Sequence, residues 1–321
     1  MGKIIVKNLD IRMYISGDKK EKKYFIKEIG DALAKVGFFT ITGHEVNGSY
    51  LDKMYGEVRT LFDLNESVKT RYENAAINRQ RGYTSFGVEK AKDAHKPDLK
   101  EFWHIGREGK SALDNVWPSE LPVFKHSMLE FYNKMDEISF TLLKALSLYL
   151  GKKEEFLPGT CLGGESILRM IHYPAIGEEA IKKIPEGSVR AAAHEDINLI
   201  TLLPAATSEG LQLLTKDGEW MDVETEGNCI IVDSGDMMQN MTGGILRSTT
   251  HRVANPKDFS KPRYSMPFFV HPRGEVSLSP DKDIIKKFSK NYINNKDKII
   301  TREITAEEYL SERLKEIGLK K

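Results

Sequence analysis

Two histidines and one carboxylate have the residue types and the spacing of a metal site: His194, Asp196 and His251. His194 and Asp196 are two positions apart in a strand-like run, so both side chains should lie on one face of a sheet, with Glu195 on the other. His251 follows in a later strand-like run, Ser248 to Val253. Two histidines and a carboxylate leave one face of the metal open, which is typical of oxygen-activating ferrous sites. We therefore expect Fe(II), in preference to zinc.

A second pair of residues has the chemistry of a carboxylate clamp. Arg263 and Ser265 alternate in the next strand-like run, so a guanidinium and a hydroxyl should face the same cavity. A guanidinium presents a planar fork that matches the two oxygens of a carboxylate. An H-x-D pair alone is weak evidence, but here it is followed in order by a turn at Asp217-Gly218, by His251 and by this clamp.

The elements that must position these residues are short β-type runs separated by Gly, Pro, Asp and Asn turns. Seven or more strands in residues 166–275 predict a jelly-roll barrel, the double-stranded β-helix, and not a series of βαβ units. The runs are ILRMIHY, AAAHEDINLITLLP, GLQLL, WMDV, NCIIVDSG, STTHRVA and RYSMPFFV. The predicted fold class is α+β with a mainly β core and helices on both sides of it in the sequence.

The rest of the chain has helical periodicity with little sheet. We expect helices from about 22, over 50–72, between 118 and 151 and after a capping box at Thr305, a strand at 38–42, loops over 78–110, and a solvated helix and loop at 282–299. The expected divisions are an N-terminal helical and strand region, a long connecting helix, the jelly-roll core and a C-terminal helical segment, at residues 1–110, 111–165, 166–275 and 276–321.

Composition favours small-molecule chemistry. The 321 residues carry 48 Lys and Arg against 47 Asp and Glu, a net charge of +1 that attracts neither nucleic acid nor an anionic membrane. The two cysteines are too few for a disulfide framework and fit a reducing compartment. We find no signal-peptide pattern and no apolar run of membrane-spanning length, so we expect a cytoplasmic protein. The oligomeric state is open.

These motifs resemble the isopenicillin N synthase-like branch of the Fe(II)/2-oxoglutarate-dependent dioxygenases over nearly the whole chain. The matching motifs are Gly37-Phe38-Phe39, Arg81-Gly82-Tyr83, Glu101-Phe102-Trp103, His194-x-Asp196, Gly210-Leu211-Gln212, Gly235-Asp236, Thr242-Gly243-Gly244, His251-Arg252-Val253 and Arg263-x-Ser265.

The resemblance implies that His194, Asp196 and His251 are iron ligands and that Arg263 and Ser265 hold the distal carboxylate of 2-oxoglutarate, with Tyr173 hydrogen-bonded to the same group. It further implies an oxidoreductase that uses dioxygen to hydroxylate, desaturate or cyclise a small organic metabolite, with release of succinate and CO2.

Alternatives stay open at this point. Isopenicillin N synthase itself uses no 2-oxoglutarate, and its Arg-x-Ser pair faces a substrate carboxylate. A second alternative is a catalytically silent protein that binds a metal or a ligand on the same barrel. His44, His104 and His172 can be structural or close to substrate, Gln239 to Met241 can line the pocket or form a turn, and Arg81, Tyr83 and Trp103 can contact substrate or fill the core.

Overall fold

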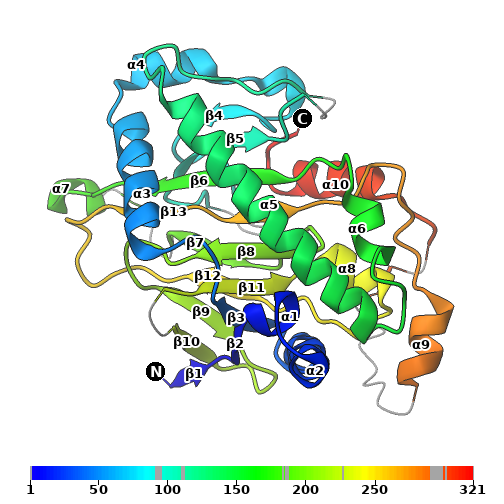
Figure 1. Cartoon of the computed structure of the whole chain (residues 1–321). Helices are drawn as coiled ribbons and strands as arrows, with labels where there is room; N and C mark the ends of the chain where they lie inside the picture. The colour runs from blue at the N-terminus through cyan, green and yellow to red at the C-terminus, as the bar shows by residue number, and fades with distance from the viewer. Residues whose placement is uncertain are drawn as a thin grey trace.

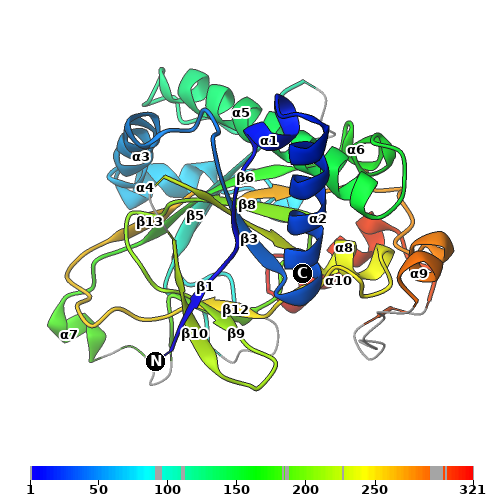
Figure 2. The same ribbon diagram turned by 60° about the horizontal axis from the view of Figure 1, so that its bottom comes forward.

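The computed structural model describes residues 2–90, 96–109, 113–182, 184, 188–225, 228–289, 299–300 and 302–320, and it has two β-sheets at its centre. Helices cover the larger sheet (Figure 1), and part of the smaller sheet lies at the bottom of the same view and comes forward in Figure 2. The inner faces of the sheets meet through Phe38, Leu213 and Ile231. This arrangement is the predicted jelly roll.

The two sheets divide the strands of the described chain between them. The smaller sheet has the order β1 (Lys3–Ile5), β10 (Trp220–Glu224), β9 (Leu211–Leu214), β12 (His251–Val253) and β7 (Ala191–His194). The larger sheet has the order β2 (Asn8–Asp10), β3 (Phe38–Thr42), β11 (Ile230–Ser234), β8 (Ile200–Pro204), β14 (Phe268–Val270), β6 (Ile167–Tyr173), β5 (Glu101–Gly106) and β4 (Gly82–Thr84), with β13 (Arg263–Ser265) paired to β6.

The long helix α5 (Phe124–Tyr149) crosses the larger sheet in Figure 1 and buries one apolar stripe against it. Tyr132 of α5 meets Phe268 of β14 edge-on, with ring centroids 4.9 Å apart. The other helices are α1 (Arg12–Ile15), α2 (Lys19–Lys35), α3 (Gly48–Phe62), α4 (Glu66–Lys69), α6 (Phe156–Cys161), α7 (Glu178–Ile181), α8 (Asp236–Met241), α9 (Lys282–Phe288) and α10 (Ala306–Glu316), with short 3-10 turns at Thr70–Tyr72 and Ala75–Ile77.

Several local expectations are confirmed. The predicted strand at 38–42 is β3, and the capping box opens α10, where the side chains of Thr305 and Glu308 each accept from the other residue's backbone N–H. The Asp217-Gly218 turn joins β9 to β10, and Gly218 has the left-handed φ of +80° that favours glycine.

Other expectations are wrong in detail. The segment 78–110, expected to be loops, contains β4 and β5. The sequence did not reveal β5 because that strand is buried at every position and therefore lacks the alternation of polar and apolar residues. The helix expected over 50–72 stops at Phe62 and resumes as α4. RYSMPFFV is two strands, β13 and β14. In the stretch 282–299, α9 is a helix, and 290–298 lies outside the described residues.

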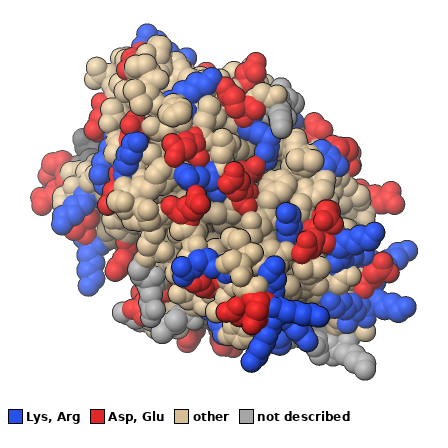
Figure 3. All heavy atoms as spheres, viewed as in Figure 1, with Lys and Arg blue, Asp and Glu red and all other residues tan. Residues whose placement is uncertain are grey.

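Charges of both signs are interspersed over the face seen in Figure 3, with Lys and Arg denser at the lower right. Among the described residues, no helix has the length and apolarity needed to cross a membrane.

Candidate metal centre

His194, Asp196 and His251 come together between the two sheets. His194 of β7 and His251 of β12 are direct partners across antiparallel strands, and their ring centroids lie 4.4 Å apart. Oδ1 of Asp196 lies 3.7 Å from Nε2 of each histidine, and one ligand atom from each residue falls within 4.8 Å of the others. These separations fit three ligands of one small cation.

Both histidines are oriented in the same way. Nδ1 of His194 lies 2.7 Å from the carbonyl oxygen of Ala192, and Nδ1 of His251 lies 3.1 Å from that of Thr249. A carbonyl oxygen only accepts, so each Nδ1 carries a proton, and each Nε2 faces Asp196 as the nitrogen that can bind a metal. Burial, with the nearby His251, lowers the pKa of His194 to about 4, which keeps its ring neutral. Neutral rings are the form that binds metal.

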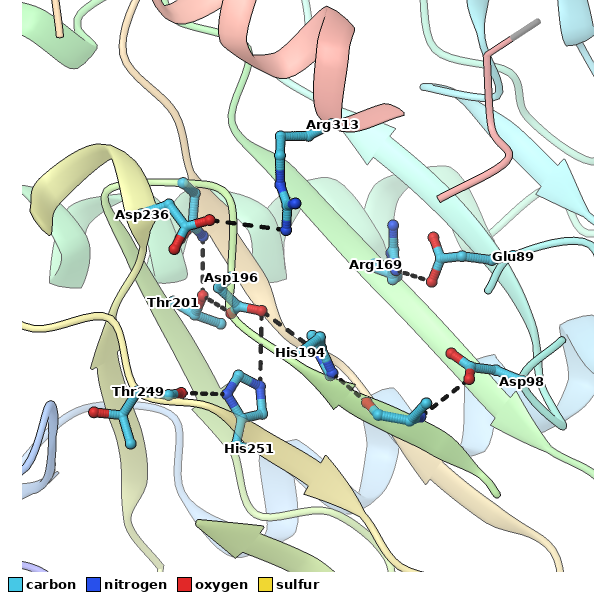
Figure 4. A network of polar contacts seen from close by, with 12 residues as sticks. Glu89, Asp98, Arg169, His194, Asp196, Thr201, Asp236, Thr249, His251 and Arg313 are labelled. Carbon is cyan, nitrogen blue, oxygen red and sulfur yellow. Dashed lines mark hydrogen bonds and ion pairs between the residues drawn. The ribbon is translucent and has the colours of Figure 1, made fainter. Parts of the chain in front are cut away.

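Asp196 is held by a chain of polar contacts. Thr201 donates a short hydrogen bond to Oδ2 of Asp196 (Figure 4). Nδ2 of Asn198 donates to the Thr201 oxygen at 2.9 Å. Oδ2 is therefore occupied, while Oδ1 faces the histidines. The sequence did not predict Thr201 and Asn198 as supports, although both stand within five residues of Asp196.

The backbone around Asp196 differs from the expected strand. β7 ends at His194, and Asp196 lies in the loop before β8. This loop is tied to the start of α8, where the N–H of Asp236 donates to the Asp196 carbonyl at 2.7 Å. A Cβ on Gly235 would lie 2.4 Å from the Asn198 carbonyl oxygen, so only glycine fits there. The ligands converge as expected, but through a loop. Glu195 turns toward Thr250, whose hydroxyl donates to it at 2.9 Å.

One cavity joins the three ligands to the predicted carboxylate clamp. It has a volume of about 630 Å³ and is lined by His194, Asp196 and His251 together with Tyr173, Arg263 and Ser265. Nη1 of Arg263 lies 3.4 Å from Oγ of Ser265, and its guanidinium stands 5.1 Å from the Tyr173 ring centre. Arg263 and Tyr173 are partners across β13 and β6.

Asp233 is a buried carboxyl in this cavity that the sequence did not predict as part of the site. It lies on β11, and its side chain shares the cavity with Asp196. Burial, reinforced by the charge of Asp196, raises its pKa well above the usual range.

A second cavity also reaches the metal ligands, and it shares Lys100 and Arg169 with the first. It measures about 770 Å³ to its mouth and is lined by His194 and Asp196, by Arg169 of β6 and by Leu310 and Arg313 of α10. Tyr309 of α10 donates to Asp236 at 2.8 Å, so the helix that covers this cavity is attached to the loop next to Asp196.

Most of the other candidates have structural contacts. Nδ1 of His172 lies 2.7 Å from Glu101, and Tyr83 and Trp103 are fully buried in the core. Arg81 pairs with Glu165 at 2.6 Å. His104 does line the second cavity. His44 is half-buried and lines neither cavity. Gln239 belongs to α8, lines neither cavity and accepts from the Ser248 N–H at 3.0 Å, so its contact is structural.

Two family models match the chain. Residues 7–120 match the N-terminal region described as "non-haem dioxygenase in morphine synthesis", and residues 164–272 match the 2OG-Fe(II) oxygenase superfamily. The second match contains all six of the predicted ligand and clamp residues.

Curated relatives and solved structures agree with these matches. A 2-oxoglutarate-Fe(II) type oxidoreductase of Metarhizium rileyi is 28% identical over 89% of this chain and 86% of its own, and Jasmonate-induced oxygenase 3 of Arabidopsis thaliana is 30% identical over 86% and 75%. A 2OG-Fe(II) oxygenase family protein of Caulobacter crescentus superposes with a TM-score of 0.80 at 32% identity, covering 97% of this chain and 99% of the other. A full-length Neurospora crassa protein solved in complex with alpha-KG gives 0.82 at 26%, covering 97% and 96%.

Proposed function

The chain belongs to the 2OG-Fe(II) oxygenase superfamily, and we propose that His194, Asp196 and His251 hold its iron. The enzyme is a non-haem Fe(II)- and 2-oxoglutarate-dependent dioxygenase that oxygenates a small organic molecule. The convergence of one carboxylate oxygen and two Nε2 lone pairs carries the assignment of the ligands. When bound, Fe(II) supplies the oxygen activation that converts 2-oxoglutarate to succinate and CO2 and oxidises a substrate C–H bond.

The cavity that contains Arg263 is proposed as the cosubstrate side. Arg263 and Ser265 bind the distal carboxylate of 2-oxoglutarate there, and the Tyr173 hydroxyl hydrogen-bonds the same group. Arg263 is 2% exposed, so its guanidinium lies in a region of low dielectric. There an arginine binds a carboxylate, with its two oxygens, in preference to a neutral group. The wall that this cavity shares with the metal ligands supports the placement.

The cavity beneath α10 is proposed as the substrate side, because it reaches His194 and Asp196 without including Arg263. Its walls exclude bulk water from the reacting bond once the substrate fills it. Two similar proteins are named for, or were solved with, a small molecule: a proline hydroxylase of Petromyces alliaceus is 28% identical, and the Neurospora crassa protein has also been solved with alpha-KG and thymine. We infer a substrate of similar size.

Succinate release tests the function and the ligand assignment together. Protein loaded anaerobically with Fe(II) and 2-oxoglutarate is exposed to oxygen, with and without a metabolite library, and succinate is measured. Succinate is expected at a low rate alone and at a raised rate with the substrate. A complete lack of succinate in every mixture, with iron bound in equal amount to protein, contradicts the proposal.

A cytoplasmic location is proposed from the thiols. Cys161 and Cys229 are both buried and free, which suits a reducing compartment. Fractionation of the source cells, followed by detection of the protein, tests this placement. Recovery of the protein outside the cytoplasmic fraction contradicts it.

A further inference from the structure

The substrate-side cavity is lined by eight charged side chains, four basic and four acidic, and four of them form a cluster beside His194, here called the charged wall: Glu89, Asp98, Lys100 and Arg169. Figure 4 shows Glu89, Asp98 and Arg169 on one side of His194, opposite Asp236 and Arg313. Lys100 lies 2.7 Å from Glu89 and 2.8 Å from Asp98, and Arg169 lies 2.9 Å from Glu89. Two cations balance two carboxylates. A buried wall with balanced charge disfavours a ligand with a net charge, because that charge would lack a counter-ion.

Arg169 is held in one orientation by neighbours on several sides. Its guanidinium carbon lies 4.3 Å from the ring centre of Phe102 and 5.3 Å from that of Phe269. Its Nε donates to Nε2 of His104 at 2.6 Å, and Nδ1 of His104 in turn lies 2.9 Å from the Arg79 carbonyl. His104 is therefore a neutral acceptor with a fixed proton. In the described chain, no residue accepts a hydrogen bond from Nη2 of Arg169, so an ordered donor is left over.

Glu89 has the complementary feature. Lys100 and Arg169 both contact Oε1, whereas Oε2 is buried and has no hydrogen-bond partner within the described ranges. Burial opposes ionisation, but Arg169 and Lys100 outweigh it and hold the pKa of Glu89 well below its usual range. A buried ionised oxygen without a donor is costly, and such groups in native proteins are commonly completed by a ligand or water.

We propose that Arg169 and Glu89 select the substrate, and that it is a small molecule of zero net charge with an N–H donor beside an oxygen acceptor. Arg169 Nη2 donates to the oxygen, and Glu89 Oε2 accepts from the N–H. A cyclic amide presents this pair on one edge, and an α-amino acid presents it as ammonium and carboxylate. The inference rests on the proposed function, because it takes this cavity as the substrate side of the iron site. Arg169 and Lys100 border both cavities, as His194 and Asp196 do.

Isosteric pairs of probes test the donor requirement by binding alone. Anaerobic calorimetry on protein loaded with Fe(II) and 2-oxoglutarate compares lactams with the matching lactones, and α-amino acids with the matching α-hydroxy acids. The wild type is expected to bind at least one N–H probe about 100-fold more tightly than its oxygen isostere. Glu89→Gln, which replaces the acceptor by an amide of the same shape, should reduce that ratio to below about 10. The pair that responds identifies the source of the N–H.

Asp98→Asn is the matched control, because it removes an equal charge from the charged wall while both Asp98 oxygens already have partners, Lys100 and the Ala192 N–H. Its binding ratio should equal that of the wild type. An unchanged ratio in Glu89→Gln, an equal loss in Asp98→Asn, or the absence of binding by every N–H probe overturns the proposal. Succinate release without added substrate is measured in parallel. If the wild type releases no succinate, the proposed function fails, and not only the inference about the substrate.

Discussion

The metal centre and the charged wall face one cavity, yet they differ in how far along the sequence the residues lie that orient their side chains. His194 and His251 are each oriented by a carbonyl two residues earlier, and Asp196 by a threonine five residues later. Arg169, in contrast, is held by His104 and Glu89, which are 65 and 80 residues away. The ligand set thus belongs to the barrel itself, whereas the charged wall exists only when β5 pairs with β6. Chemistry and selectivity have separate structural origins in this molecule.

The largest expected effect breaks the metal centre alone. Asp196→Ala removes the oxygen on which both histidines converge, so iron content should fall to background and succinate release should drop by about 1000-fold or more. Iron is measured by metal analysis of the purified protein. Glu195→Gln, at the adjacent position, is expected to retain full iron. Equal iron in Asp196→Ala and the wild type would refute the assignment.

A smaller effect separates the cosubstrate from the iron. Arg263→Gln shortens the side chain and removes the charged fork, and the KM for 2-oxoglutarate should rise by about 30-fold or more, as for other buried charge pairs. Iron binding should not change. Arg252→Gln makes the same chemical change on β12, where Arg252 stacks on Trp220 at 4.0 Å, and it should leave this KM unaltered. An unchanged KM for 2-oxoglutarate in Arg263→Gln would contradict the proposal that Arg263 binds this cosubstrate.

A smaller effect is expected from Thr201, whose hydroxyl donates to Asp196 and orients it. Thr201→Val preserves shape but removes the donor to Oδ2, so iron affinity should fall by about 10-fold, the lower end for such supports. Titration of the metal-free protein with Fe(II) under anaerobic conditions measures it. Thr40→Val, a buried threonine of β3, is the comparison variant. Equal affinities in the two variants would show that Thr201 has no role in orienting Asp196.

The last prediction concerns pH and depends on Asp233, a buried carboxyl of β11 that has no salt bridge to the described residues. The folded-state pKa of Asp233 lies above its ordinary value of 3.8, so its contribution to stability is present below that value and is lost as pH rises through the folded pKa. Asp233→Asn should therefore stabilise the protein at pH 7 by about 1–3 kcal/mol, with a difference that shrinks toward pH 4. Urea unfolding at several pH values, with and without iron, measures the change. A variant less stable than the wild type at pH 7 contradicts the prediction.

The same difference in sequence separation between contacting residues decides which features could be predicted from the sequence. The candidate ligands and the clamp were predicted from short motifs and their order along the chain, and the capping box of α10 is local as well. Asp196 lies beside the two histidines as predicted, but in a loop and not in the expected strand, because that loop depends on the Asp236 N–H and on the close approach of Gly235. The charged wall could not be predicted, because no short motif links Glu89 to Arg169 and because β5, buried throughout, lacks the alternation that marks a strand.

The attachment of α10 has a thermodynamic consequence. Tyr309 and Arg313 contact Asp236, whose N–H bonds the carbonyl of Asp196, so the cover of the cavity and the metal loop form one cooperative unit. Ligands that order one part of such a unit raise the opening free energy of the rest. Amide hydrogen exchange in α10 is therefore expected to slow when iron binds, although none of the proposed iron ligands lies on that helix.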